Sequence, residues 1–197
     1  MYTIIDKNNT YIDDTVTIGE GCIIHPNVML IGNTVIGDNT TIYLGSYIKD
    51  STIGKNNTIY TSYIMDSEIG DNNIIGPYIH IRPDNVIGND NKLGSFVVLK
   101  NNEIGNNVRI PHLSYVGDTE VEDNVNIGAG VKTANQSIDK VKHRTLIKEG
   151  SFVGCNSVLV APVTINKKSL IAAGSTITED VPEGTLAIAR CRQVNKE

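Results

Sequence analysis

Aliphatic residues recur at every sixth position along most of this chain. The first uninterrupted run is Ile12, Ile18, Ile24, Leu30, Ile36, Ile42 and Ile48. After several five-residue steps the repeat resumes at Ile75 and continues to Ile127. A period of six matches neither the 3.6-residue period of a helix nor the alternation of a half-buried strand. The pattern therefore predicts a structure in which each hexapeptide is one repeating unit.

The six-residue period predicts an all-β coil with three sides. Each hexapeptide forms one short strand with its aliphatic side chain pointing inward, and three hexapeptides, about 18 residues, complete one turn. Successive turns stack about 4.8 Å apart as parallel strands. Asn, Asp and Gly are frequent and suit the corners, because these residues tolerate positive φ. The alternative, an ordinary β-sandwich, needs turn signals at longer spacing and leaves the period of six unexplained.

The repeat divides the chain into coils, one loop and a tail. Coils are expected over residues 12–133 and 147–181, with an inserted loop at 134–146 that contains the polar, basic run ANQSIDKVKHR. Residues 182–197 form a short C-terminal tail. A loop of this length inside a compact repeat is usually functional. We therefore expect a single domain over residues 1–197, with a function for its loop.

The charge and composition of the chain indicate which partners, membranes and metals it is expected to bind. The formal net charge of −5 gives no reason to expect nucleic acid or an anionic membrane. No run approaches the roughly 18 apolar residues that span a bilayer, and residues 1–10 lack a signal-peptide core. Cys22, Cys155 and Cys191 are widely spaced, which suggests neither disulfides nor a zinc site. We expect a cytoplasmic protein with reduced thiols and no bound metal.

The register of the coil places two basic residues together. Ile81 and Leu99 are three hexapeptides apart, so Arg82 and Lys100, one position later, should lie one above the other. Like charges directly opposite on neighbouring strands are destabilising. A phosphate between them would relieve the repulsion and suit both side chains. The alternative is a pair of solvated side chains that turn away from each other.

A second candidate lies between Arg109 and Gly130. His112 occupies the third position of its hexapeptide, and Ala129 occupies the same position one turn later, in the small-residue turn that begins at Gly128. A histidine near its ordinary pKa of about 6.5 can take a proton at neutral pH. A backbone N–H beside it can stabilise an oxyanion. The pairing suits acyl transfer to an amine or hydroxyl, whereas His112 taken alone suits a plain surface corner.

Several motifs of the chain resemble a known enzyme family. The runs IGPYIHIRPDNVIG, GSFVVLKN, PHLSYVGD, VNIGAG and LVAPVTI are similar to the acetyltransferase domain of bifunctional glucosamine-1-phosphate acetyltransferase/N-acetylglucosamine-1-phosphate uridyltransferase. The similarity extends from about residue 10 to residue 190, and no counterpart is expected for the family's N-terminal nucleotidyltransferase domain. The resemblance implies a left-handed parallel β-helix, an exception to the usual right-handed crossover. It also implies a homotrimer that transfers an acetyl group from acetyl-CoA directly to an amino-sugar phosphate.

The resemblance also assigns roles to residues that match the family's motifs. His112 matches the general base. The acceptor contacts, which include one lysine from the loop, are Arg82, Lys100, Tyr115, Asn126 and Lys142. The coenzyme contacts are Ala129, Asn135, Gln136, Cys155, Ala173 and Arg190. In the family's trimer the loop and tail complete a site between neighbouring subunits, which accounts for the break in the repeat.

Four positions depart from the family pattern around the chemistry. Pro111 replaces an Asn before the base, Cys155 replaces a Ser at the coenzyme site, and Gln136 replaces a Tyr in a loop with one extra residue. Val98 replaces a Glu two residues before the phosphate-binding Lys100. A carboxylate partner orients an imidazole and stabilises its protonated form. Its loss, with the phosphate residues retained, indicates a shifted substrate or reduced activity.

Three functions are compatible with these residues. The first is the acetyl-CoA-dependent acyltransferase, acting on glucosamine-1-phosphate, a related amino-sugar phosphate or a nucleotide-linked sugar. The second is a catalytically impaired trimer that keeps the sugar-phosphate site as a scaffold, docked beside a separate nucleotidyltransferase. The third is a metal-dependent β-helix hydratase, which His80 and His112 disfavour because they lie on different faces of the coil. Retention of His112 and Asn126 favours the acyltransferase.

Overall fold

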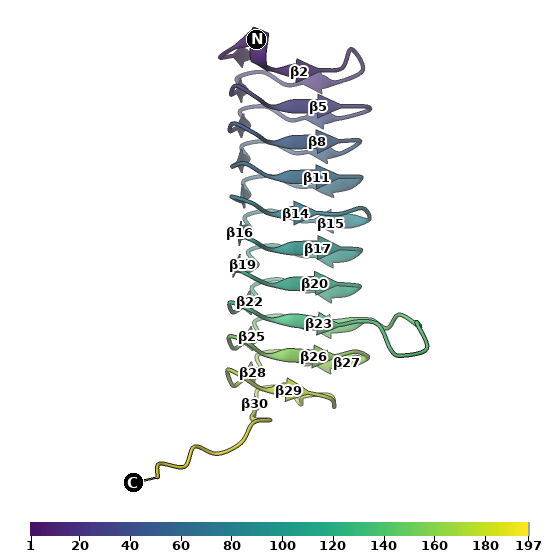
Figure 1. Ribbon diagram of the computed structural model, residues 1–197, viewed down its shortest axis with the longest axis vertical. Helices are drawn as coiled ribbons and strands as arrows, with labels where there is room; N and C mark the ends of the chain where they lie inside the picture. Colours follow the sequence, from purple (N-terminus) through teal and green to yellow (C-terminus); the bar gives the residue numbers. More distant parts are fainter. Residues whose placement is uncertain (197) are drawn as a thin grey trace.

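The computed structural model describes residues 1–196 as a column of short parallel strands (Figure 1). The strands form three sheets, and the chain visits them in turn, so that neighbours within a sheet are mostly three strands apart in sequence. A 3-10 helix, η1 (Lys7–Asn9), lies between the first two strands. Within the described residues, no helix is both long and apolar enough to cross a membrane. The predicted all-β coil is confirmed.

We call the three sheets face 1, face 2 and face 3. Face 1 contains β1 (Thr3–Ile4), β4 (Ile23–Ile24), β7 (Thr41–Ile42), β10 (Thr58–Ile59), β13 (Ile74–Ile75), β16 (Lys92–Ser95), β19 (Arg109–His112), β22 (Asn126–Ile127), β25 (Phe152–Val153), β28 (Leu170–Ile171) and β30 (Leu186–Ala187). Face 2 contains β2 (Tyr11–Ile12), β5 (Met29–Ile31), β8 (Tyr47–Lys49), β11 (Tyr63–Met65), β14 (His80–Ile81), β17 (Val98–Lys100), β20 (Tyr115–Gly117), β23 (Lys132–Ala134), β26 (Val158–Val160) and β29 (Thr176–Ile177). Face 3 contains β3 (Thr17–Ile18), β6 (Val35–Ile36), β9 (Thr52–Ile53), β12 (Ser67–Ile69), β15 (Asn85–Ile87), β18 (Asn102–Ile104), β21 (Thr119–Val121), β24 (Thr145–Ile147) and β27 (Val163–Ile165).

The interior of the column is one aliphatic cluster. The sixth-position residues are its main members, and Ile24, Ile42, Ile81 and Leu99 are completely buried. Each such side chain packs between its equivalents one turn above and one turn below. Burial of each contributes roughly 1.5–3 kcal/mol relative to exposure. The aliphatic repeat in the sequence therefore corresponds to one continuous core.

Asn, Asp and Gly occupy most corners that require positive φ, as predicted. Asn27 at φ 59° and Asp84 at φ 68° are typical. The corner between faces 1 and 2 is different, because Tyr78, Phe96 and Leu113 hold φ of 58°, 58° and 52° on successive turns. Bulky residues are rare in this conformation. All three side chains are also exposed.

Regular pairing extends beyond the predicted coil boundaries. β1 pairs Ile4 with Ile24, before the expected start at residue 12. β30 pairs Ala187 with Ile171, after the expected end at residue 181. A terminal turn has a neighbour on one side only, so Ile4 and Ala187 are only partly buried. The aliphatic signal is therefore weakest at the two ends of the column.

A buried ladder of Asn side chains runs beside the core. Asn57, Asn73 and Asn91 occupy equivalent positions on successive turns and are almost fully buried. Asn73 donates its Nδ2–H to Gly88 O at 3.0 Å, and its Oδ1 accepts the Asn91 backbone N–H at 2.8 Å. Each side chain thus satisfies backbone groups that the corner leaves without a strand partner.

We expect Asn73→Ala to destabilise the fold by about 1–3 kcal/mol, because it leaves the Asn91 N–H and the Gly88 carbonyl buried without partners. Urea unfolding followed by circular dichroism measures the change. Glu68→Ala, on the exposed side of β12, is the control and should stay within about 0.5 kcal/mol of the wild type. Equal stability of both variants and the wild type would contradict the structural role of the ladder.

Candidate functional site

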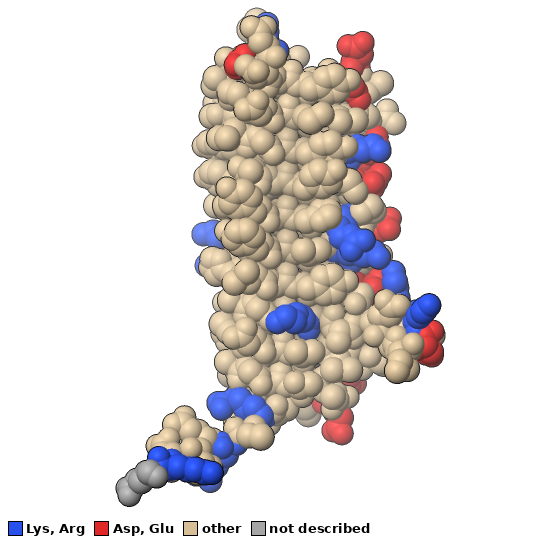
Figure 2. All heavy atoms as spheres, in the orientation of Figure 1, with Lys and Arg blue, Asp and Glu red and all other residues tan. Residues whose placement is uncertain are grey.

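Arg82, Lys100 and Lys142 form a basic cluster on face 2. The Arg82 backbone N–H bonds Leu99 O at 2.9 Å, which places Arg82 beside Lys100 on the next turn, as predicted. Lys142 from the loop is the largest cause of a lowered Lys100 pKa, followed by desolvation and the charge of Arg82, whereas Asp118 opposes them. Figure 2 shows basic side chains gathered at mid-height, on the side from which the loop projects. Three cations held this close suit an anion with more than one charge.

Tyr115 lies directly below this cluster on β20. Val98 pairs with Tyr115, and Lys100 pairs with Gly117. A Cβ atom at Gly117 would lie 2.5 Å from the Tyr115 hydroxyl oxygen and 3.1 Å from Asn135 Nδ2. Because Gly117 has no side chain, the phenol and the amide can both approach the space beneath Lys100. The predicted acceptor residues Arg82, Lys100 and Tyr115 are thus neighbours.

The inserted loop is a small hairpin, seen projecting between β23 and β24 in Figure 1. Gln136 and Lys142 form an antiparallel bridge, and the His143 N–H bonds Asn135 O at 2.8 Å. The Asn135 side chain bonds the buried carboxylate of Asp118. The hairpin therefore turns the loop back on itself and returns Lys142 to the basic cluster.

His112 ends β19 at the corner between faces 1 and 2. Its carbonyl accepts the Gly130 N–H at 3.3 Å and the Ser114 hydroxyl at 2.9 Å, which confirms the predicted contact with the small-residue turn. The imidazole is exposed, and within residues 1–196 it makes no hydrogen bond or ion pair with a side chain. Val98, which stands where a Glu was expected from the resemblance, offers no carboxylate to orient it.

Four residues of the site lie in one line along this corner. The Asn156 N–H bonds Ala129 O at 2.8 Å, and the Gly174 N–H bonds Cys155 O at 2.8 Å, so the line continues from one turn to the next. Its members, which we call the corner column, are His112, Ala129, Cys155 and Ala173. Arg190 closes its C-terminal end, with its Cδ 3.8 Å from where a Cβ of Gly174 would lie.

The turn at Ala129 leaves a donor free. The Gly128 N–H donates to Val153 O, and the Gly130 N–H donates to His112 O. The Ala129 N–H, by contrast, donates no backbone hydrogen bond within the part of the chain that the structure describes. Since Ala129 is only partly buried, this N–H is available to an oxygen placed beside His112.

Within one chain, Asn126 lies apart from the basic cluster, and the two predicted coenzyme residues of the loop lie apart from the corner column. Asn126 pairs with Arg109 and projects from face 1, whereas Tyr115 and the cations belong to face 2. Gln136 is exposed on the loop, away from the corner column. Asn135, matched to the coenzyme by resemblance, lies instead beside Asp118 and Tyr115. One chain therefore holds the predicted residues on two faces.

The other histidines are not grouped with His112. His80 belongs to β14 of face 2, and desolvation, followed by the charge of Arg82, lowers its pKa. His25 stacks on Tyr43 at 4.5 Å, near the N-terminal end of the column. Across residues 1–196, no group of three His, Cys, Asp or Glu side chains is placed to hold a metal ion.

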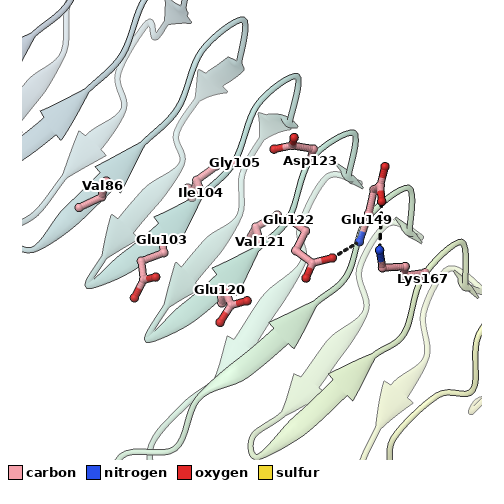
Figure 3. Close-up of a pocket in the computed structure, with 10 residues that line it drawn as sticks. All are labelled: Val86, Glu103, Ile104, Gly105, Glu120, Val121, Glu122, Asp123, Glu149 and Lys167. Atoms are coloured by element: carbon pink, nitrogen blue, oxygen red, sulfur yellow. Dashed lines mark hydrogen bonds and ion pairs between the residues drawn. The ribbon is translucent and has the colours of Figure 1, made fainter.

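Face 3 carries the opposite charge to face 2. Figure 3 shows a hollow in this face lined by acidic side chains. Lys148 lies 3.1 Å from Glu120 and 3.0 Å from Glu122, and Lys167 lies 3.2 Å from Glu149. Both lysines are therefore already paired with carboxylates. An anionic substrate is therefore better accommodated on face 2 than in this hollow.

Sequence reasoning missed two contributors to the site. Gly117 makes room for Tyr115, and Asp118 holds Asn135. The register could have found Gly117, because it follows Lys100 by one turn. Asp118 gave no signal, since Asp and Asn recur at corners throughout the chain.

These features define a class of protein, a hexapeptide-repeat β-helix with a cation cluster on one face and a histidine at the corner where that face begins. The chain belongs to the family described as the GMPPB C-terminal domain, whose sequence model matches residues 6–111. It is 49% identical to the bifunctional protein GlmU of Clostridium kluyveri over 195 residues, 99% of this chain and 42% of that protein. It is 50% identical to GlmU of Geobacillus sp. (strain WCH70), with the same coverage. The chain thus spans about two fifths of these relatives, and the resemblance to the acetyltransferase domain is confirmed.

Solved structures confirm the fold. The Arabidopsis UDP-N-acetylglucosamine acyltransferase gives a TM-score of 0.63 at 20% identity, covering 95% of this chain and 69% of that chain. The corresponding enzyme of Bacteroides fragilis gives 0.59 at 20% identity, covering 92% and 70%. The column is a left-handed parallel β-helix, as the resemblance implied.

We expect inorganic phosphate to bind the basic cluster and to dissociate as the pH rises. Because Lys142 lowers the pKa of Lys100, Lys100 should lose its proton below the pH of about 10.4 that is usual for lysine. Phosphate prefers the protonated form, so its affinity should fall first in that range. Lys142→Gln should weaken binding at neutral pH and move the alkaline fall to higher pH. Calorimetric titrations from pH 8 to pH 11 test both, and an unmoved fall in the variant would rule out the coupling.

Proposed function

We propose that this chain is an acetyl-CoA-dependent acyltransferase that N-acetylates glucosamine-1-phosphate or a related amino-sugar phosphate. The observation that carries the proposal is the pairing of His112 with the small-residue turn at Ala129 at one end of face 2, with the basic cluster at the other end of the same face. A phosphate on Arg82, Lys100 and Lys142 would leave its sugar to extend across face 2 towards this corner. The GlmU relatives, which match almost the whole chain, support the same function.

The acceptor would be held by its two ends. Arg82, Lys100 and Lys142 bind the phosphate, and Tyr115 contacts the sugar from the strand below. Asn126 contacts the sugar from face 1. Because Asn126 and Tyr115 project from different faces, this arrangement requires a second copy of the chain. We include a homotrimer in the proposal, in which face 1 of one copy lies against face 2 of the next.

The coenzyme would lie along the corner column. Ala129, Cys155 and Ala173 present small side chains on successive turns, which leaves room for an extended ligand. Arg190 at the end of the column carries a charge that suits a coenzyme phosphate. Asn135 and Gln136 complete the coenzyme site from the loop of a neighbouring copy.

In the proposed step, His112 removes a proton from the sugar amine as the amine nitrogen attacks the thioester carbonyl carbon. A C–N bond forms, and negative charge develops on the carbonyl oxygen. The Ala129 N–H stabilises this oxyanion. The C–S bond then breaks, and the imidazolium returns its proton to the departing sulfur. The products are the N-acetylated sugar phosphate and free coenzyme A.

The second candidate is a trimeric scaffold that binds sugar phosphate without turnover, beside a separate nucleotidyltransferase. The observation in its favour is the imidazole of His112, which has no carboxylate partner within the described residues because Val98 replaces the Glu. An imidazole without such a partner is a weaker base. Acetyl-CoA that binds but releases no thiol in the presence of any amino-sugar phosphate would favour the scaffold.

We expect the wild type to release thiol from acetyl-CoA in the presence of glucosamine-1-phosphate. His112→Ala should reduce kcat by a factor of about 10²–10⁴, the usual loss on removal of a general base. His25→Ala, whose ring only stacks on Tyr43, is the matched control and should retain full turnover. Turnover that survives in His112→Ala would remove this histidine from the mechanism.

A further inference from the structure

Asp118 is an unusual member of the corner between faces 2 and 3. Corner residues on earlier turns include Asp66 and Asp84, which also have positive φ and are exposed. Asp118 shares the conformation, at φ 49°, but is only 4% exposed. Its two carboxylate oxygens accept side-chain N–H groups from Asn101, on the turn above, and Asn135, at the start of the loop. A carboxylate enclosed by two amides is fixed in position.

Asp118 contacts both ends of the loop. Its side chain holds Asn135, where the loop leaves face 2. Its backbone carbonyl accepts the Thr145 N–H at 3.2 Å, where the loop enters face 3. Between these points the His143 N–H bonds Asn135 O at 2.8 Å. The neck of the hairpin is therefore closed by three hydrogen bonds, two of which use Asp118.

The closed neck opposes a repulsion. Lys142 lies next to the neck, where it bridges Gln136, and its charge acts on Lys100. Without an anion these side chains push the hairpin away from face 2. A loop of exposed residues has little buried surface to resist that push, since Gln136, Lys140 and Val141 are all exposed. The bonds at the neck and the ion pair between Arg144 and Glu103, at 2.7 Å, restrain it.

We propose that Asp118 is a positioning residue that keeps the neck of the loop closed and thereby holds Lys142 beside Lys100 for the anion. The proposal rests on the phosphate-binding role given above to the basic cluster. It makes Asp118, a residue that touches no substrate, a determinant of acceptor affinity. The effect acts through Asn135, so the two residues should behave as one unit.

Asp118→Asn separates this role from a simple effect of charge. Loss of a negative charge near three cations should, by Coulomb attraction alone, tighten phosphate binding. Loss of the neck should weaken it, because the Asn amide cannot accept from both Asn101 and Asn135. We expect the Kd for inorganic phosphate, measured by calorimetry on the full chain, to rise about tenfold, the scale of one lost hydrogen bond.

Two variants control the experiment. Asp90→Asn removes an exposed carboxylate with positive φ from the corner between faces 3 and 1, away from the basic cluster, and should leave the Kd unchanged. Asn135→Ala should weaken phosphate binding as much as Asp118→Asn, and the double variant should show no further loss. Amide hydrogen exchange should increase at His143 and its loop neighbours in Asp118→Asn, while the strands stay protected.

Several outcomes would overturn the proposal. They are unchanged or tighter phosphate binding in Asp118→Asn, additive losses in the double variant, and faster exchange spread over all turns, which would mark a merely structural role. Absence of phosphate binding in the wild type would remove the anion site itself. Phosphate binding without acetyl transfer would leave this proposal standing and count only against the enzyme, so the two failures are distinguishable.

Discussion

The hydrogen bonding of each turn to the next is the constraint on which the rest of this structure depends. Residues about 17 or 18 positions apart are placed side by side, as when Arg82 bonds Leu99 or Gly130 bonds His112. A shift of one residue would carry every inward aliphatic side chain to the surface, so the core fixes the register. The same register then decides which surface side chains meet. Core and site are thus set by one geometric rule.

This rule places groups together even where they repel. Arg82 and Lys100 are neighbours because Ile81 and Leu99 must stack, and their charges have no influence on that choice. The loop adds Lys142 to them, and Lys142 lowers the pKa of Lys100. The energy of the fold therefore maintains a concentration of positive charge that Asp118 relieves in part and that a bound anion would relieve further. A preorganised site of this kind makes the unbound fold less stable but raises its affinity for the anion.

The sequence predicted the parts of the site that lie within unbroken repeats. The pairing of Arg82 with Lys100 and the contact of His112 with its turn follow from counting. Cys155 and Ala173 lie beyond the loop, where the phase of the repeat is lost, so their line with His112 needed the structure. The bond between Asp118 and Asn135 was also out of reach, because a hairpin loop follows no period. The repeat predicts that Asn126 points outward, since it precedes the inward Ile127. It did not lead us to expect that Asn126 and Tyr115 lie on different faces.

The corner of Tyr78, Phe96 and Leu113 carries backbone strain and exposed apolar surface that the proposed homotrimer would relieve. Each residue holds a left-handed conformation that costs about 1–3 kcal/mol for a bulky side chain and that Asn or Gly adopts more easily elsewhere in the same column. Each also leaves 58–62% of its surface exposed, so burial within one chain does not offset the strain. Tyr78 and Phe96 stack at 5.4 Å, which makes a continuous apolar edge. This edge lies at the junction of faces 1 and 2, where the proposed homotrimer would bring a second copy. Contact between copies along it would bury the exposed rings and bring Asn126 of one chain towards Tyr115 of another.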